Sequence, residues 1–138
     1  MSYDLVVYLQ RKKMPSPQTW HSSIVDAGFP VALDVDFDVD AFSGFLPCPV
    51  NGEISGFEYY ASALSPADIQ ELELAPGTDF SIQFCIGSRP LELISALAAS
   101  SVLAAVSGGS LADPQAGESI PAGSAVSWAK AQLAQLGA

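Results

Sequence analysis

Apolar and polar residues alternate in several segments of the chain, which is the pattern of β-strands. Residues 3–10, with the sequence YDLVVYLQ, are rich in β-branched and aromatic residues and predict a strand covered on both faces. Residues 56–64 and 79–87 predict two more strands. In residues 79–87 aromatic and aliphatic side chains alternate with smaller or polar ones.

The sharpest alternation lies in residues 31–42, with the sequence VALDVDFDVDAF. It predicts a strand with one core face and one acidic face. Because aspartate is a poor strand former, the acidic face must be exposed and solvated. The predicted core face consists of Val31, Leu33, Val35, Phe37 and Val39, and the predicted acidic face of Asp34, Asp36, Asp38 and Asp40.

Two serine–proline pairs mark predicted helix starts. Residues 16–27 and residues 65–75 each open with this pair. The serine oxygen accepts a hydrogen bond from a backbone N–H that lacks a helical partner, and proline at the first helical position loses no hydrogen bond. Gly28 ends the first of these helices in a left-handed conformation.

The C-terminal third contains two predicted helices with little charge. Residues 90–106 are apolar or small on nearly every side, with Glu92 as the only charge. Their 17 residues reach the lower limit for a membrane span, but three serines favour a buried core helix. A small hairpin around Asp113 and Pro114 follows, and Pro121 opens a last amphipathic helix.

The order of these elements defines the expected fold. Residues 43–56 form a loop with a tight hairpin turn at Asn51-Gly52. Strands and helices mix in the pattern of an α+β protein, with a small antiparallel or mixed sheet and helices mainly on one face. A ferredoxin-like topology with an extra C-terminal helix is the most economical arrangement. No repeat or linker divides residues 1–138, which we expect to form a single domain.

Composition adds a negative field and spare apolar surface. The chain has 138 residues, of which 49% are hydrophobic and 14% charged, and its formal net charge is −10. Since an average domain is about a quarter charged, some apolar surface should lie outside the core. A negative protein repels phosphate, which excludes nucleic acids and anionic lipid as expected partners. Eleven of the fifteen acids lie between Asp26 and Asp79.

The N-terminal region and the cysteines indicate a reducing compartment. The basic residues follow a short apolar run, which is the reverse of the order in a signal peptide, so we expect a cytoplasmic protein. Cys48 and Cys85 lie 37 residues apart without a CxxC motif. They are expected to be buried or idle thiols, and a disulfide has no support.

The aspartate row has three interpretations. On one strand face, carboxylates two residues apart lie about 6.6 to 7 Å from each other, which is too wide for neighbours to bind one ion. The spacing also lacks the glycine and glutamate of a calcium loop. The row can be a solvated strand face that discourages aggregation, a docking site for a basic partner or, least favoured, a cation site. Tyr60 is a candidate anchor beside the row.

A second candidate site is basic. Arg11, Lys12 and Lys13 precede the first predicted helix and could bind an anion there with His21, or could form a solvated turn. His21 is the only histidine, and with two distant cysteines it is too little for a zinc site. No GxSxG, P-loop, GxGxxG or HExxH motif occurs.

These features favour a non-catalytic, cytoplasmic interaction protein without metal or cofactor, such as an immunity-like or antitoxin-like inhibitor, or an adaptor, of a basic partner. One alternative is a sensor of small ligands or anions with a pocket between the first predicted helix and the sheet, which uses Arg11, Lys12 or Lys13 with His21. Another is a hydrolase-type enzyme that uses His21 with a carboxylate. Homodimerisation through the small-residue helix at 90–106 also stays open.

Overall fold

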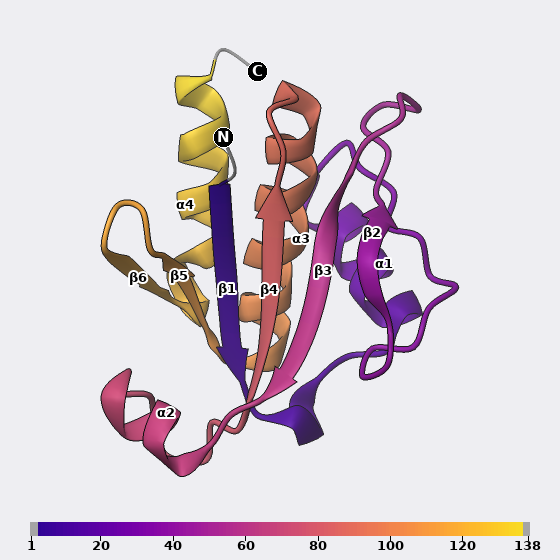
Figure 1. Ribbon diagram of the computed structural model, residues 1–138. Helices are drawn as coiled ribbons and strands as arrows, with labels where there is room; N and C mark the ends of the chain where they lie inside the picture. The colour runs from indigo at the N-terminus through magenta and orange to yellow at the C-terminus, as the bar shows by residue number, and fades with distance from the viewer. Residues whose placement is uncertain (1–2, 137–138) are drawn as a thin grey trace.

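The computed structural model describes residues 3–136, which form one six-stranded sheet with helices behind it (Figure 1). The strand order is β2-β3-β4-β1-β5-β6, and every neighbouring pair is antiparallel. The strands are β1 (Tyr3–Leu9), β2 (Ser43–Pro47), β3 (Gly56–Ala63), β4 (Phe80–Ile86), β5 (Ser110–Asp113) and β6 (Glu118–Pro121). The helices are the 3-10 helix η1 (Arg11–Lys13) and the α-helices α1 (Pro17–Asp26), α2 (Pro66–Glu71), α3 (Pro90–Ser107) and α4 (Ala122–Gln135).

Three of the four α-helices cover one face of the sheet. Helices α1, α3 and α4 lie behind the strands in Figure 1, and α2 lies beyond their ends. The α+β class and the antiparallel sheet with helices mainly on one face are therefore confirmed, as is the C-terminal helix. The ferredoxin-like topology stays a prediction, because that pattern has four strands and two helices, whereas this sheet has six strands.

Helix α3 lies at the centre of the fold. It contacts β1, β3, β4 and β5 of the sheet, and α1 and α4 lie on either flank of it in the same layer of helices. Eleven of its residues are buried, most of them alanine, serine or leucine. Its length and composition would also suit a membrane span, but 61% of the segment is buried inside the protein. Its small residues let the sheet and the two neighbouring helices approach closely.

Trp20 joins α1 to this centre. The fully buried indole donates a hydrogen bond from Nε1 to the carbonyl oxygen of Ala99 on α3, at 2.9 Å. The rings of Phe37, Tyr59 and Phe84 lie 6.1 to 6.4 Å from the Trp20 ring, centre to centre. One side chain thus links α1, α3 and the helix-facing side of the sheet.

The strand predicted at residues 31–42 is wrong. Only Val31 makes a β-bridge there, with Val50, and the regular strand β2 begins at Ser43 inside the predicted loop. Two aspartates explain the difference, because the side chain of Asp34 accepts a hydrogen bond from the backbone two residues on, and that of Asp38 does so from the backbone two and three residues on. Such local bonds compete with the ladder of a sheet.

The turn predicted at Asn51-Gly52 is confirmed. Both residues have positive φ, 51° and 79°, as a two-residue hairpin turn requires. Val50 and Glu53 exchange backbone hydrogen bonds of 3.0 and 2.9 Å across it.

Substitution of Gly109, which lies just before β5, tests how closely this strand approaches β1. A Cβ atom there would lie 2.2 Å from the backbone oxygen of Tyr8, so we expect Gly109→Ala to lower the free energy of unfolding by about 1 to 3 kcal/mol. Gly123 on α4 has no atom within 4 Å of its added Cβ, so Gly123→Ala should be neutral or stabilising. Urea unfolding of both variants measures this, and equal stabilities would contradict the close approach.

Candidate functional site

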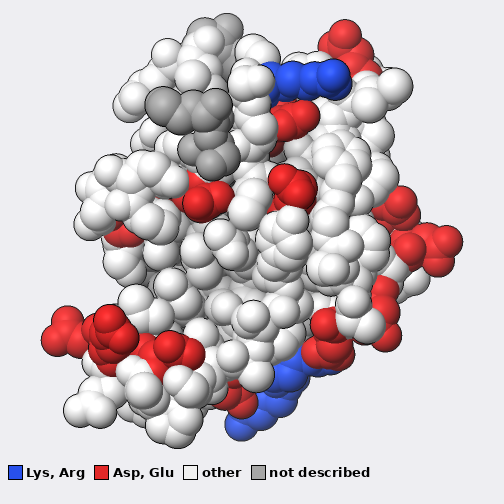
Figure 2. Space-filling model, in the orientation of Figure 1, with Lys and Arg blue, Asp and Glu red and all other residues white. Residues whose placement is uncertain are grey.

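The sheet face opposite the helices is open to solvent. Side chains alternate along each strand, so the residues between the buried ones point to this face. Figure 2 shows this face in the orientation of Figure 1: uncharged atoms fill most of it, and acidic side chains lie in its upper half, beside α2 and along the β2 side. Basic side chains lie at its upper and lower edges. The expectation that β1 is covered on both faces is wrong, because Val6 and Tyr8 are only partly buried.

The strand registers place the open-face side chains in rows. In the middle row Tyr60, Gln83, Val6 and Ala112 lie side by side across β3, β4, β1 and β5. No member of this row carries a charge. In the next row Cys85 stands between two acids, Glu58 of β3 and Asp4 of β1. The face therefore has an uncharged centre with carboxylates beside it.

A hollow of about 270 Å³ lies at the α2 end of the face. Tyr8, Ala112 and Ser119 form its floor on the sheet, and Leu72 and Leu74, which follow α2, form a wall. Leu72 is 47% exposed. Burial raises the pKa of Tyr8, and the nearby carboxylate of Asp68 raises it further. This end of the face thus combines apolar contact surface with negative charge.

Tyr60, the predicted anchor, lies on the open face. Its hydroxyl donates a hydrogen bond to Oε1 of Glu58 at 2.8 Å, and this bond raises the pKa of Tyr60. The ring is partly exposed, at 37%. A neutral, oriented tyrosine of this kind offers both an apolar ring and a polar tip to a partner.

The two cysteines are free thiols. Cys85 lies on the open face, and its burial together with a hydrogen bond and repulsion from Asp4 raises its pKa to about 12. Cys48 is buried behind the sheet, and burial likewise raises its pKa to about 12. Both thiols are protonated at neutral pH, the form in which cysteine is a poor nucleophile.

The predicted aspartate row forms a loop before β2 and not a strand face. Asp36 is exposed, whereas Asp34 and Asp38 accept local backbone hydrogen bonds. Asp40 forms an ion pair with Arg11, and the guanidinium lowers the pKa of this carboxyl. The loop therefore adds charge beside the β2 edge, and part of that charge is neutralised.

The basic candidates make contacts in different parts of the fold. The guanidinium of Arg11 bonds Asp40 and lies 5.6 Å from the centre of the Phe80 ring. Lys12 and Lys13 are exposed in η1. His21 on α1 is partly buried, and its Nδ1 accepts a hydrogen bond from the backbone N–H of Leu33 at 3.2 Å. Two of the four predicted anion-binding residues thus have structural partners of their own.

Metal-ligating residues are also dispersed. Within residues 3–136, no group of three or more histidine, cysteine, aspartate or glutamate side chains is placed to hold a metal ion.

The sequence pattern did not identify Val6, Tyr8 and Ala112 as residues of the open face, or Leu72 as part of the wall of the hollow. The alternation within residues 3–10 places Val6 and Tyr8 on one face, but only the position of the helices decides which face stays open. The Ser65-Pro66 helix start, which lies between the two strands β3 and β4, indicated a short helix in the connection that contains Leu72 and Leu74.

Compared with protein-family models, curated proteins and solved structures, the chain shows no match.

The Arg11–Asp40 ion pair should make the stability of the protein depend on pH. Since the folded-state pKa of Asp40 lies below its ordinary value of 3.8, the pair stabilises the protein above that pH, and this contribution disappears as the pH falls through the lowered pKa. Both side chains are about half exposed, so Asp40→Asn should lower the free energy of unfolding by less than about 1 kcal/mol at pH 7.

Urea unfolding at pH 7 and pH 3 measures this effect. The difference between wild type and Asp40→Asn should shrink at the lower pH, and the exposed Asp36→Asn serves as the control for lost charge alone. A difference that is the same at both pH values, or an equal effect of the control, would contradict a role for the ion pair.

Proposed function

We propose that the protein is a non-catalytic interaction module that binds a basic protein partner on its open sheet face. One observation carries the proposal: all the helices that pack on the sheet lie on one side, and the bare side has an uncharged centre with acids beside it. An immunity-like or antitoxin-like inhibitor, or an adaptor, is the class of protein that this surface suits. A cytoplasmic location belongs to the same proposal.

The anatomy of the face supports this function. Protein interfaces combine a core poor in charge with a polar rim, and tyrosine is enriched among their strongest contacts. Tyr8 and Tyr60 lie on the open face, and Leu72 stands at its border. Strands lie about 4.8 Å apart, so a six-stranded sheet spans roughly 24 Å. The longest strands have seven or eight residues and are roughly 25 Å long, so the face has a projected area of at most roughly 600 Å², comparable with the about 800 Å² that each partner buries in an ordinary interface.

The charge of the chain supports a basic partner. With a formal net charge of −10, the protein attracts a cationic surface from a distance and speeds its approach. Asp4 and Glu58 on the face and Asp68 at the α2 end provide local negative charge. Long-range attraction and local complementarity thus favour the same class of partner.

His21, the residue considered for catalysis, has another role in the fold. Its Nδ1 atom accepts a hydrogen bond from the backbone N–H of Leu33. This contact supports the interaction module over the hydrolase-type alternative.

Variants of the face test the proposal with candidate partners, the basic proteins encoded by neighbouring genes. Tyr60→Ser and Leu72→Ser should each weaken binding at least about tenfold, which corresponds to 1.4 kcal/mol of lost contact. Val25 on α1 is 53% exposed on the helix side, so Val25→Ser is the matched control and should change the affinity less than twofold. Biolayer interferometry measures the dissociation constants.

The reverse ranking would refute the proposal: a partner whose binding is insensitive to Tyr60→Ser and Leu72→Ser but is lost with Val25→Ser. Circular dichroism of each variant shows that the fold is retained.

The acidic loop makes a kinetic prediction. Replacing Asp34, Asp36, Asp38 and Asp40 together by asparagine reduces the formal net charge from −10 to −6 and keeps the local oxygen acceptors. We expect a slower association rate, by about threefold to tenfold at low salt, with little change in dissociation. Stopped-flow association at two salt concentrations checks this, and an unchanged rate at low salt would remove the loop from partner steering.

A further inference from the structure

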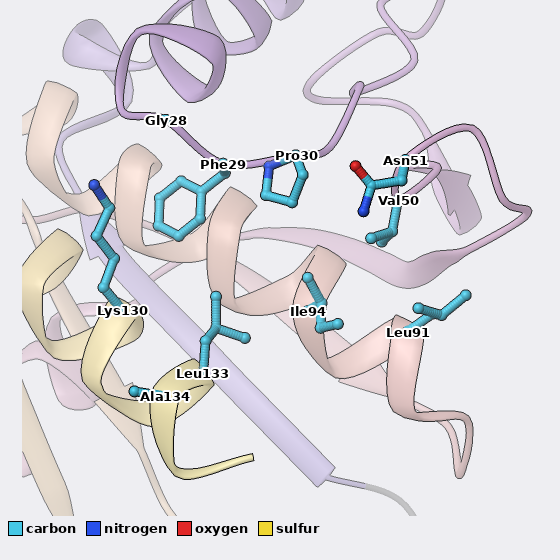
Figure 3. Close-up of a pocket in the computed structure, with 10 residues that line it drawn as sticks. All are labelled: Gly28, Phe29, Pro30, Val50, Asn51, Leu91, Ile94, Lys130, Leu133 and Ala134. Carbon is cyan, nitrogen blue, oxygen red and sulfur yellow. The ribbon is translucent and has the colours of Figure 1, made fainter. Parts of the chain in front are cut away.

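A cleft of about 510 Å³ opens on the helix side of the molecule, away from the open sheet face (Figure 3). The loop after α1, the turn between β2 and β3, and helices α3 and α4 form its walls. Most of the side chains in it are apolar. They include Phe29, Val50, Leu91, Ile94 and Leu133. This volume falls in the range of about 300 to 1,000 Å³ that small-molecule sites have.

One cation, Lys130 of α4, stands at one end of the cleft, and Asn51 lies at the other (Figure 3). The Nζ atom of Lys130 lies 5.5 Å from the centre of the Phe29 ring. A Cβ atom at Gly28 would lie 3.7 Å from this Nζ, an ordinary van der Waals contact, so the backbone of Gly28 lies beside the ammonium group.

Among the described residues 3–136, Lys130 forms no ion pair with an acidic side chain. The chain has five basic and fifteen acidic residues, and the one ion pair within residues 3–136 joins Arg11 to Asp40. The Phe29 ring attracts the positive charge of the ammonium group, but the ring has no oxygen atom that could accept a hydrogen bond from its three N–H groups. The charge at the cleft end is therefore available to an external anion.

We infer that this cleft binds a small amphipathic carboxylate, with the carboxylate at Lys130 and an aliphatic or aryl chain along Phe29, Ile94 and Leu133. The cation supplies charge complementarity for the head group, and the walls supply apolar contact for the chain. Each additional buried CH₂ should raise the affinity about fourfold while the chain still fits. The site is separate from the proposed partner surface, since the sheet lies between them.

Decanoate and octanoate are the probes for this inference. In a titration followed by amide NMR, decanoate below its micellar range should cause saturable shifts at Gly28, Phe29 and Leu133. Decanoate has two more CH₂ groups than octanoate and should therefore bind about fifteenfold more tightly. The decyltrimethylammonium cation, which has the same chain and the opposite charge, should bind at least tenfold more weakly than decanoate.

Three variants locate the site. Lys130→Met should weaken decanoate binding at least tenfold, whereas Lys13→Met removes the same charge from the exposed η1 segment and should have less than a twofold effect. Ala134→Trp, at an exposed position of α4 that lines the cleft, should block binding although Lys130 is present. Thermal unfolding of each variant verifies the fold.

Equal affinity of wild type and Lys130→Met for decanoate would overturn the inference. Shifts that map to the open sheet face, tighter binding of the cation, or no saturable binding to the wild type would overturn it as well. Partner binding by the Tyr60 and Leu72 variants is a separate readout, so the two proposals can fail independently.

Discussion

The burial of helix α3 against the sheet, with a helix on each flank, is the constraint on which the rest of the structure depends. The helix is apolar or small along most of its length, and 11 of its 18 residues are buried. Strands β1, β3, β4 and β5 cover the side that faces the sheet, and α1 and α4 pack against its two flanks. Trp20 shows how closely the layers fit, because its indole reaches across to a carbonyl of α3.

In this arrangement the three longer helices, α1, α3 and α4, all pack on the same side of the sheet. Helix α2 has only six residues, lies beyond the strand ends and buries no side chain of its own, so it cannot cover the other side. Because the other two longer helices pack beside α3, no helix remains to cover the opposite face of the sheet, and that face is open. The open face also accounts for the composition, since a chain that keeps charge away from much of one face has few charged residues in total. This face is the surface on which we propose that a basic partner binds.

The sequence predicted most elements because their signals are local. The two Ser-Pro helix starts and the Asn51-Gly52 turn each depend on the conformations of a few adjacent residues. The strand at residues 31–42 failed because aspartate side chains can bond their own backbone, and this competition is invisible in a pattern of apolar and polar residues.

The candidate sites were harder to predict, because they depend on how distant elements meet. Tyr60 could be placed on a strand face, but which face stayed bare depended on α1, α3 and α4. Lys130 is a single lysine in an Ala-rich helix, and nothing in its sequence neighbourhood indicates a binding site. Its position gained meaning only when Phe29, from a loop about a hundred residues earlier, came beneath its ammonium group.

Methyl cross-saturation NMR of the protein bound to a basic partner tests the central claim most directly, because it reports which side chains the partner covers. The account predicts that irradiating the partner attenuates the methyl signals of Val6 and Ala112 on the open face. The exposed methyl groups of Val25 and Val106, on α1 and α3, should keep their intensity. Attenuation of Val25 and Val106, with Val6 and Ala112 unaffected, would contradict the account.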